Sequence, residues 1–158
     1  MRYQTFTQAH TQRGVAMIEF AISLPLLLLL LLAIAEFGRM LYQYNSLLQA
    51  SRDAGRFVAG QAWNATLGTV DLQSGGALEA QTKNVALYGV PANPNGYPPV
   101  VTGLTAASVQ VSALGTDHVS VSISYTFQPV IGSGLPALIG AAMPMNVPLV
   151  ATTVMRAL

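Results

Sequence analysis

Residues 13–37 read RGVAMIEFAISLPLLLLLLLAIAEF, and this stretch decides the fold. Residues 20–35 carry no charge, and a helix over 15–35 has about the 20 residues that cross the hydrocarbon core of a bilayer. A charged side chain costs roughly 2.5–3.5 kcal/mol at the middle of a bilayer, so an acid beside the apolar run is expected to have a partner and a function. The sequence therefore predicts one membrane span with a functional carboxylate, Glu19, at its start.

The composition indicates a membrane protein with a modest exported part. The chain has 158 residues, of which 52% are hydrophobic and 8% charged, whereas about 25% are charged in a typical soluble domain. The formal net charge is +1 and the basic residues are scattered, so no surface for nucleic acid is expected. The length leaves room for one domain beside the membrane segment.

Metal sites, cofactors and catalysis are not expected. The chain has no cysteine, and His10 and His118 are far apart in sequence, without a second ligand at metal-binding spacing. Asp117 and His118 are adjacent, but neighbouring side chains on a strand point to opposite faces, which is poor geometry for an acid and base pair. We expect these two residues to close the turn of the hairpin instead. We expect no enzymatic activity and no small-molecule substrate.

The charges around the span predict its orientation. Residues 1–14 carry Arg2 and Arg13 and no acid, while Glu36 follows the apolar run, so the N-terminus is expected in the cytoplasm. The expected organisation is a cytoplasmic leader at 1–14, a long helix at 15–60 and a small exported domain at 61–158. The helix would span the cytoplasmic membrane over about 15–35 and continue outside it over 36–60.

A secretory signal is the second interpretation of the same stretch. Ala33-Ile34-Ala35 before Glu36 resembles a cleavage site, and cleavage there would release a soluble protein that starts at Glu36. The apolar region is longer than the usual 7 to about 15 residues of a signal, and Glu19 lies at its entry. Helical periodicity also continues through the supposed cut, so the membrane span is favoured.

An apolar stripe predicts that the helix continues beyond the membrane. Its members recur at three- and four-residue steps: Phe37, Met40, Leu41, Tyr44, Leu47, Leu48, Ala54 and Val58. The stripe can pack on the chain's own domain, on a neighbouring subunit, or on both through different faces. Phe37, Leu41, Tyr44 and Leu48 are the candidate packing residues. Gly38 and Gly55 each cost about 1 kcal/mol relative to alanine in a helix, which indicates close approach of another backbone or of a sheet.

The C-terminal half predicts a small antiparallel sheet. Alternation of apolar and polar residues predicts two strands, 108–114 and 118–127, joined by a hairpin turn, and a third strand at 147–155 that pairs with them. A short helix at 77–87 and a proline-rich loop at 90–99 precede the strands. One face of the sheet would pack on the helix, and the other would be rich in serine and threonine and wet. The fold class is α+β, with a long N-terminal transmembrane helix that continues into the exported part and packs on a small antiparallel sheet.

The region around the span resembles a known family. Gly14, four residues, then Glu19-Phe20 and a long apolar run are similar to type IV prepilins. GVAMIEFA at 14–21, LPLL at 24–27, EFG at 36–38 and SRDAGR at 51–56 more closely resemble the TadE-like minor pseudopilins of tight-adherence (Tad/Flp) pilus systems. The resemblance covers about residues 13–60 and implies a pilin-like fold.

The resemblance also implies a function and a set of site residues. A prepilin peptidase would cut between Gly14 and Val15, with Phe20 as a recognition residue beyond the cut. The product would be a minor pilin or assembly subunit of a bacterial tight-adherence (type IVb) pilus or a related secretion machine. Its partners would be other pilin subunits, pilus assembly proteins, the peptidase and inner-membrane lipid, with possible incorporation in an extracellular pilus.

Cleavage would create a charge pair that the uncut chain lacks. A new amine at Val15 and the carboxylate of Glu19 attract strongly in a poorly hydrated setting, within one chain or between neighbours. The resemblance implies the version between subunits. The alternative function is a non-polymerising, single-span or secreted protein whose exported domain binds a ligand or surface.

Overall fold

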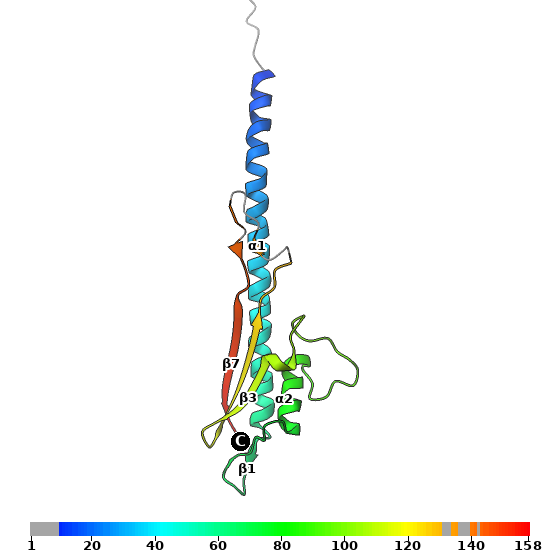
Figure 1. The fold of residues 1–158 in the computed structure, drawn as a ribbon, viewed down its shortest axis with the longest axis vertical. Helices are drawn as coiled ribbons and strands as arrows, with labels where there is room; N and C mark the ends of the chain where they lie inside the picture. The colour runs from blue at the N-terminus through cyan, green and yellow to red at the C-terminus, as the bar shows by residue number, and fades with distance from the viewer. Residues whose placement is uncertain (1–9, 131–133, 136–139, 142) are drawn as a thin grey trace, which may run out of the picture. The chain divides into compact units, whose positions relative to one another are not determined.

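In this computed structural model the described residues are 10–130, 134–135, 140–141 and 143–158. Two helices, one short 3-10 helix and seven strands follow one another along them (Figure 1): α1 (His10–Ala59), β1 (Trp63–Asn64), β2 (Thr69–Val70), α2 (Ala77–Tyr88), η1 (Ala106–Ser108), β3 (Val109–Leu114), β4 (His118–Thr126), β5 (Gly134–Leu135), β6 (Met143–Pro144) and β7 (Pro148–Arg156). The chain divides into two compact units, Met1–Phe37 with Pro129–Met145, and Gly38–Gln128 with Asn146–Leu158.

The long N-terminal helix is confirmed as α1, which is 50 residues long. It begins at His10, earlier than the expected start near residue 15, so Gly14 lies inside the helix and not before it. Residues 1–9, which hold Arg2 and most of the expected leader, lie outside the described residues. Pro25 lies within the helix, and the Ser23 hydroxyl donates to the Phe20 carbonyl at 3.2 Å.

The first unit joins the apolar part of α1 to a short hairpin. β5 and β6 pair antiparallel, with Gly134 opposite Pro144 and Leu135 opposite Met143. Gly134 has to be glycine, because a Cβ there would overlap the backbone of Met143 and Pro144. The remaining residues between β4 and β7, at 131–133, 136–139 and 142, lie outside the described residues.

The second unit holds the expected antiparallel sheet, in the order β3-β4-β7. The hairpin register pairs Leu114 with His118, and the long pair β4 and β7 runs from His118 opposite Arg156 to Thr126 opposite Pro148. A sheet of this length forms because alternate residues of β4 are apolar and bury on one face. The predicted α+β arrangement, a long helix on small antiparallel sheets, is confirmed.

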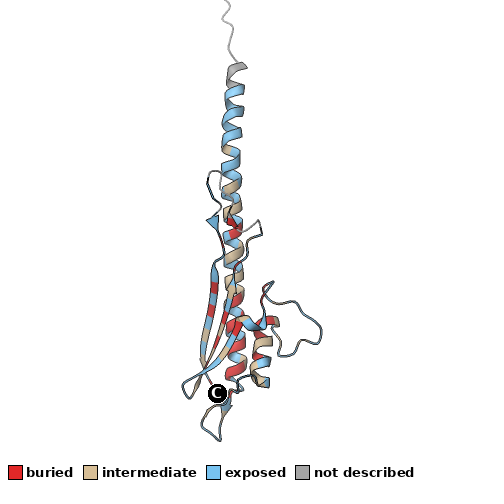
Figure 2. Cartoon of the chain, in the orientation of Figure 1, coloured by how far each residue is buried: buried red, intermediate tan, exposed pale blue. Residues whose placement is uncertain are grey.

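The core of the second unit lies between the inner face of the sheet and the C-terminal half of α1 (Figure 2). The sheet contributes Val109, Val119, Val121, Ile123, Leu149 and Ala151, and α1 contributes Leu47, Ala50, Ala54 and Val58, all of them buried. Burying one such valine, leucine or isoleucine stabilises the fold by about 1.5–3 kcal/mol. The small side chains of α1 let the sheet approach the helix closely.

The outer face of the sheet is only partly as predicted. Serine and threonine do line it, and the Ser122 and Thr152 hydroxyl oxygens are 2.8 Å apart across the register. Val150 and Val154 of β7 are also exposed on this face. β7 carries apolar residues on both of its faces, although only one face is buried. The outer face of the sheet is therefore mixed, with hydroxyl groups along β4 and exposed valines along the edge strand β7.

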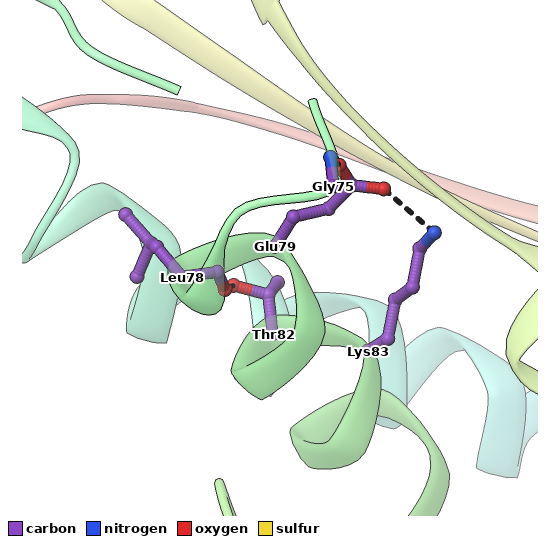
Figure 3. Close-up of polar contacts among 5 residues, drawn as sticks. All are labelled: Gly75, Leu78, Glu79, Thr82 and Lys83. Atoms are coloured by element: carbon purple, nitrogen blue, oxygen red, sulfur yellow. Dashed lines mark hydrogen bonds and ion pairs between the residues drawn. The ribbon is translucent and has the colours of Figure 1, made fainter. Parts of the chain in front are cut away.

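The short helix α2 matches the predicted one and ends at Gly89, whose φ of 74° is left-handed. Its first turn is held by polar contacts (Figure 3). Lys83 Nζ lies 2.6 Å from Glu79 Oε1, and the Gly75 amide donates to Glu79 Oε2 at 2.7 Å. The hydrogen bond from Lys83, followed by that from the Gly75 amide, lowers the pKa of Glu79 below its ordinary value of 4.5.

The hairpin β1–β2 lies within residues 61–76, a stretch rich in glycine and small polar residues for which the sequence predicts no strand. Each strand has only two residues, with Trp63 opposite Val70, which is too short to give a period-two pattern. The Asn64 side chain organises the turn by accepting from the Thr66 and Leu67 amides. The Val70 amide then donates to the Thr116 carbonyl, which ties this hairpin to the turn between β3 and β4.

Candidate processing and assembly site

The residues expected at the processing site all lie in the first turns of α1. Gly14, Val15, Glu19 and Phe20 are exposed. A Cβ at Gly14 would meet no atom within 4 Å, so no described part of the chain covers the bond that follows it. Because Gly14 is within a helix, a peptidase would have to open the first turns, and glycine makes this easier by about 1 kcal/mol relative to alanine.

Val15 and Glu19 are four residues apart in a continuous helix, so they lie on one face, one turn from each other. Glu19 makes no ion pair or hydrogen bond with any residue that the structure describes. An amine at Val15 would stand close enough to pair with this carboxylate in the same chain. The exposure of both residues equally allows a pair between two chains.

No residue in the most apolar part of α1 is buried by the described residues of the chain. Within the described residues this is the one helix long and apolar enough to cross a membrane, and none of its most apolar window is buried. Leucine, isoleucine and phenylalanine side chains are exposed all round it. A helix that is apolar on every face needs lipid or other helices around it.

The four candidate packing residues fall into two groups. Phe37 and Leu41 are 50% and 58% exposed, so the chain's own domain does not cover them. Tyr44 and Leu48 are half-buried. The buried positions of this half of α1 are Leu47, Ala50, Ser51, Ala54 and Val58, and Ser51 contacts Thr153 of the sheet. The stripe seen in the sequence is thus two surfaces, one used inside the domain and one left open.

The two helix glycines also differ. At Gly55 a Cβ would lie 3.4 Å from Thr153 Cγ2 and 3.5 Å from Met155 Sδ, so β7 makes the expected close approach there. At Gly38 a Cβ would meet nothing within 4 Å. Gly38 therefore belongs to the open surface with Leu41 and Tyr42, which are both exposed.

Glu36 has a position that the sequence did not reveal. It is only 5% exposed, although it closes a long apolar run, and its Oε1 accepts a hydrogen bond of 2.9 Å from the Val130 amide. Arg39 lies three positions further along the helix, a spacing that favours only a weak ion pair. The contact with Val130 joins residues 94 positions apart, so no local pattern could have predicted it.

Arg39 anchors the end of β4 to α1 in the second unit. Its guanidinium donates to the Gln128 carbonyl and lies 4.8 Å from the centre of the buried Phe127 ring. A guanidinium over an aromatic face contributes about 0.5–1 kcal/mol at exposed sites, and more where water is excluded. Arg39 therefore stabilises the contact between α1 and the residues that directly follow β4.

The prediction that Asp117 and His118 point to opposite faces is wrong. His118 Nδ1 lies 2.7 Å from Asp117 Oδ1, and Arg156 Nε lies 3.4 Å from Asp117 Oδ2. Asp117 is in the turn before β4, where strand alternation does not apply, so its carboxylate can reach both neighbours. The three side chains close the end of the sheet at the register pair of His118 and Arg156.

Comparison with known proteins gives one match. A sequence model of the TadE-like protein family matches residues 14–56, which include the residues of the expected processing site, the apolar run and the exposed Phe37 and Leu41. No curated protein and no solved structure matches the chain. The TadE-like family is a family of Tad pilus components and not of enzymes. Over residues 14–56, about a quarter of its length, the chain is therefore similar to the TadE-like protein family.

Proposed function

We propose that the protein is a minor pilin or assembly subunit of a bacterial tight-adherence pilus, or of a related secretion machine. The observation that carries this proposal is the sequence from Gly14 to Phe20 at the start of a bare apolar helix, inside the segment that matches the TadE-like family. A plain membrane anchor needs neither a glycine nor an acid at this position. The proposed partners are other pilin subunits, pilus assembly proteins and a prepilin peptidase.

The proposed processing removes residues 1–14 at the cytoplasmic face of the inner membrane. Helix α1 then begins at Val15, whose new amine adds to the positive end of the helix dipole. Glu19, one turn further on, is the carboxylate that this amine would meet. In the assembly we assign Glu19 to the amine of a neighbouring subunit, which would fix the axial position of the two helices.

The open surface of α1 supports packing between subunits. Phe37, Gly38, Leu41 and Tyr42 are exposed at and just beyond the end of the apolar run, and Gly38 leaves space for a close neighbour. Large exposed apolar residues at consecutive turns are a feature of interaction surfaces. The half-buried Tyr44 and Leu48 would lie at the border between this surface and the domain core.

The intact mass of the protein extracted from membranes tests the processing step. Loss of residues 1–14 supports the proposal. A full-length protein favours a non-polymerising single-span protein, and a start at Glu36 favours a secreted one. Gly14→Val should block the cut without disturbing the fold, because the Gly14 position is open. Mature protein that begins at Val15 in this variant would contradict the proposed site.

Incorporation of Glu19→Gln into sheared filaments and membrane complexes tests the assembly step. The substitution keeps the shape of the side chain and removes its charge, so insertion and processing should persist while assembly is weakened. Ile18→Val is the matched control, since it changes an exposed apolar neighbour without altering charge. Normal assembly of Glu19→Gln would exclude the charge pair.

A further inference from the structure

The loop between α2 and η1 contains a pair of residues, Asn95-Gly96, that has no part in the proposed function. Figure 1 shows this loop projecting beyond the end of α2. Hydrogen bonds hold the loop near both of its ends. The Asn84 side chain donates to the Pro91 carbonyl at 3.1 Å, and farther on the Val100 amide donates to the Leu87 carbonyl at 2.8 Å. The pair lies between these two anchors and is exposed to water.

An asparagine followed by glycine can react with its own backbone. The amide nitrogen of Gly96 has to reach Cγ of the Asn95 side chain, and glycine has no Cβ to hinder the approach. The chain contains six asparagines, and Asn95 is the one that glycine follows. Serine, alanine, valine or proline follows each of the others. The sequence thus offers one position at which this reaction is sterically favoured.

The turn that holds the pair is clamped, yet it leaves the attacking nitrogen lightly bonded. Asn93 is the clamp, because its Oδ1 accepts from the Tyr97 amide at 2.7 Å and its Nδ2 donates to the Tyr97 carbonyl at 2.9 Å. Gly96 has a left-handed φ of 67°, and its amide reaches the Asn93 carbonyl only at 3.4 Å. A Cβ at Gly96 would meet no atom within 4 Å, so no described residue covers this side of the pair.

A proton donor lies beside the group that has to leave. Asn95 Nδ2 donates to the Tyr97 hydroxyl oxygen at 3.2 Å. After attack by the backbone this nitrogen becomes an amine, whose lone pair can accept the phenol proton in its turn. Residues 89–105 include no charged residue and no histidine, so the phenol is the strongest proton donor that the loop itself supplies.

We propose that Asn95-Gly96 is a self-modification site, at which Asn95 is converted through a cyclic imide to isoaspartate and aspartate without an enzyme. A bond forms between the Gly96 nitrogen and Asn95 Cγ, and the bond from Cγ to Nδ2 breaks. The Gly96 amide proton passes to water, the Tyr97 proton passes to the departing nitrogen, which leaves as ammonia, and water returns a proton to the phenol. A second water then opens the imide at one of its two carbonyls.

The product differs from the original chain in charge and in backbone length. A carboxylate replaces a neutral amide, which lowers the formal net charge by one, from +1 to 0. Isoaspartate also adds one CH₂ group to the backbone inside the clamped turn, so the hydrogen bonds between Asn93 and Tyr97 should loosen. The reaction needs neither a membrane nor a filament, and the proposal is therefore independent of the proposed function.

Ageing of the full-length chain in detergent at neutral pH tests the site. Peptides from successive time points are analysed by mass spectrometry with electron-transfer fragmentation, which separates isoaspartate from aspartate. Conversion at Asn95 should exceed that at each other asparagine by at least about tenfold, because glycine leaves the attack unhindered. The controls within the same molecule are Asn45, Asn64, Asn84, Asn93 and Asn146. Conversion at Asn95 that is no faster than at these positions would overturn the proposal.

Tyr97→Phe tests the proton donor. The substitution keeps the ring and the backbone groups that bond Asn93, and it removes only the phenol. Conversion in the folded chain should slow by about three- to tenfold, since a positioned acid assists departure of the amine. Tyr88→Phe is the matched control, because it removes a hydroxyl from the last residue of α2 instead. In urea, where the turn is lost, Tyr97→Phe and wild type should convert at the same rate.

The folded-state rates decide the part assigned to Tyr97. Equal rates in Tyr97→Phe and wild type would remove the phenol from the reaction. Faster conversion in Tyr97→Phe would mean that the bond to the phenol restrains Asn95, and this would overturn the assigned role as well.

Discussion

Ser51 of α1 and Thr153 of β7 place their hydroxyl oxygens 2.9 Å apart where the helix meets the sheet. Ser51 is fully buried, and its hydroxyl also lies 3.0 Å from the Leu48 carbonyl. The contact joins two residues 102 positions apart in the sequence. It is a polar bond in an otherwise apolar interface, and it fixes the position of β7 along the helix.

Removing this bond from one side should destabilise the second unit. Ser51→Ala leaves the Thr153 hydroxyl without its partner, and the expected cost is about 1–2 kcal/mol of unfolding free energy. Denaturant unfolding of the full chain in detergent, followed by circular dichroism, measures it. Ser46→Ala, which removes only a local bond to the Tyr42 carbonyl, is the control and should cost less.

The double variant Ser51→Ala with Thr153→Val sharpens the same prediction. Replacing both partners by apolar groups removes the unsatisfied hydroxyl. The double variant should therefore lose less unfolding free energy than the two single variants lose together. Strict additivity of the two effects would mean that the hydroxyl groups do not interact in solution.

At Gly55 the effect of a substitution on stability should depend strongly on the size of the new side chain. A Cβ would be in van der Waals contact with Thr153 and Met155, so Gly55→Ala should be neutral or gain up to about 1 kcal/mol from helix propensity. Gly55→Leu would push β7 away and should cost about 1–3 kcal/mol. The unfolding midpoints of the two variants in detergent measure the difference. Equal stability would mean that β7 does not pack against this turn.

Gly38 should behave differently, because no described atom lies within 4 Å of its Cβ position. Gly38→Ala is expected to stabilise the isolated chain by up to about 1 kcal/mol. If Gly38 admits a neighbouring subunit, the same variant should enter filaments less efficiently than wild type. Melting in detergent and recovery in sheared filaments give the two readouts. Unimpaired assembly would remove Gly38 from the proposed contact.

Glu79 should make stability depend on pH at the acid end. Lys83 and the Gly75 amide hold its pKa below the ordinary 4.5, so its contribution is present above pH 4.5 and is lost as the pH falls through the lowered value. Glu79→Gln should reduce this acid sensitivity and Lys83→Met should weaken it. Thermal melts between pH 7 and about pH 3 test both. An unchanged profile in Glu79→Gln would contradict the assignment.

Elements with a strong repeating pattern could be predicted from the sequence. The long helix, the strands β3, β4 and β7 and the helix α2 each follow from periodicity over six or more residues. The hairpins β1–β2 and β5–β6 could not be found this way, because strands of two residues carry no period. Their formation depends on turns and on close backbone contact.

In the candidate site, too, local features could be predicted from the sequence and contacts between distant segments could not. Gly14 and Glu19 were recognisable because their spacing and their place before an apolar run are local features. The contacts of Glu36 with Val130 and of Arg39 with Gln128 join residues about 90 positions apart, so no local pattern on the helix could predict them. Asp117 and His118 close the hairpin turn as expected, but the contact between their side chains was not predicted, because strand alternation does not hold for the turn residue Asp117.

The position of β7 in the chain has a consequence for biogenesis. This strand, Pro148–Arg156, closes the sheet over the turn of α1 that contains Ser51 and Gly55. During synthesis that turn emerges from the ribosome about a hundred residues before the strand that covers it, since long-range β pairing waits for both partners. In the proposed topology, the exported half of the nascent chain lacks its last strand until translocation is almost over, and a membrane-inserted first half of α1 would tether it during that time.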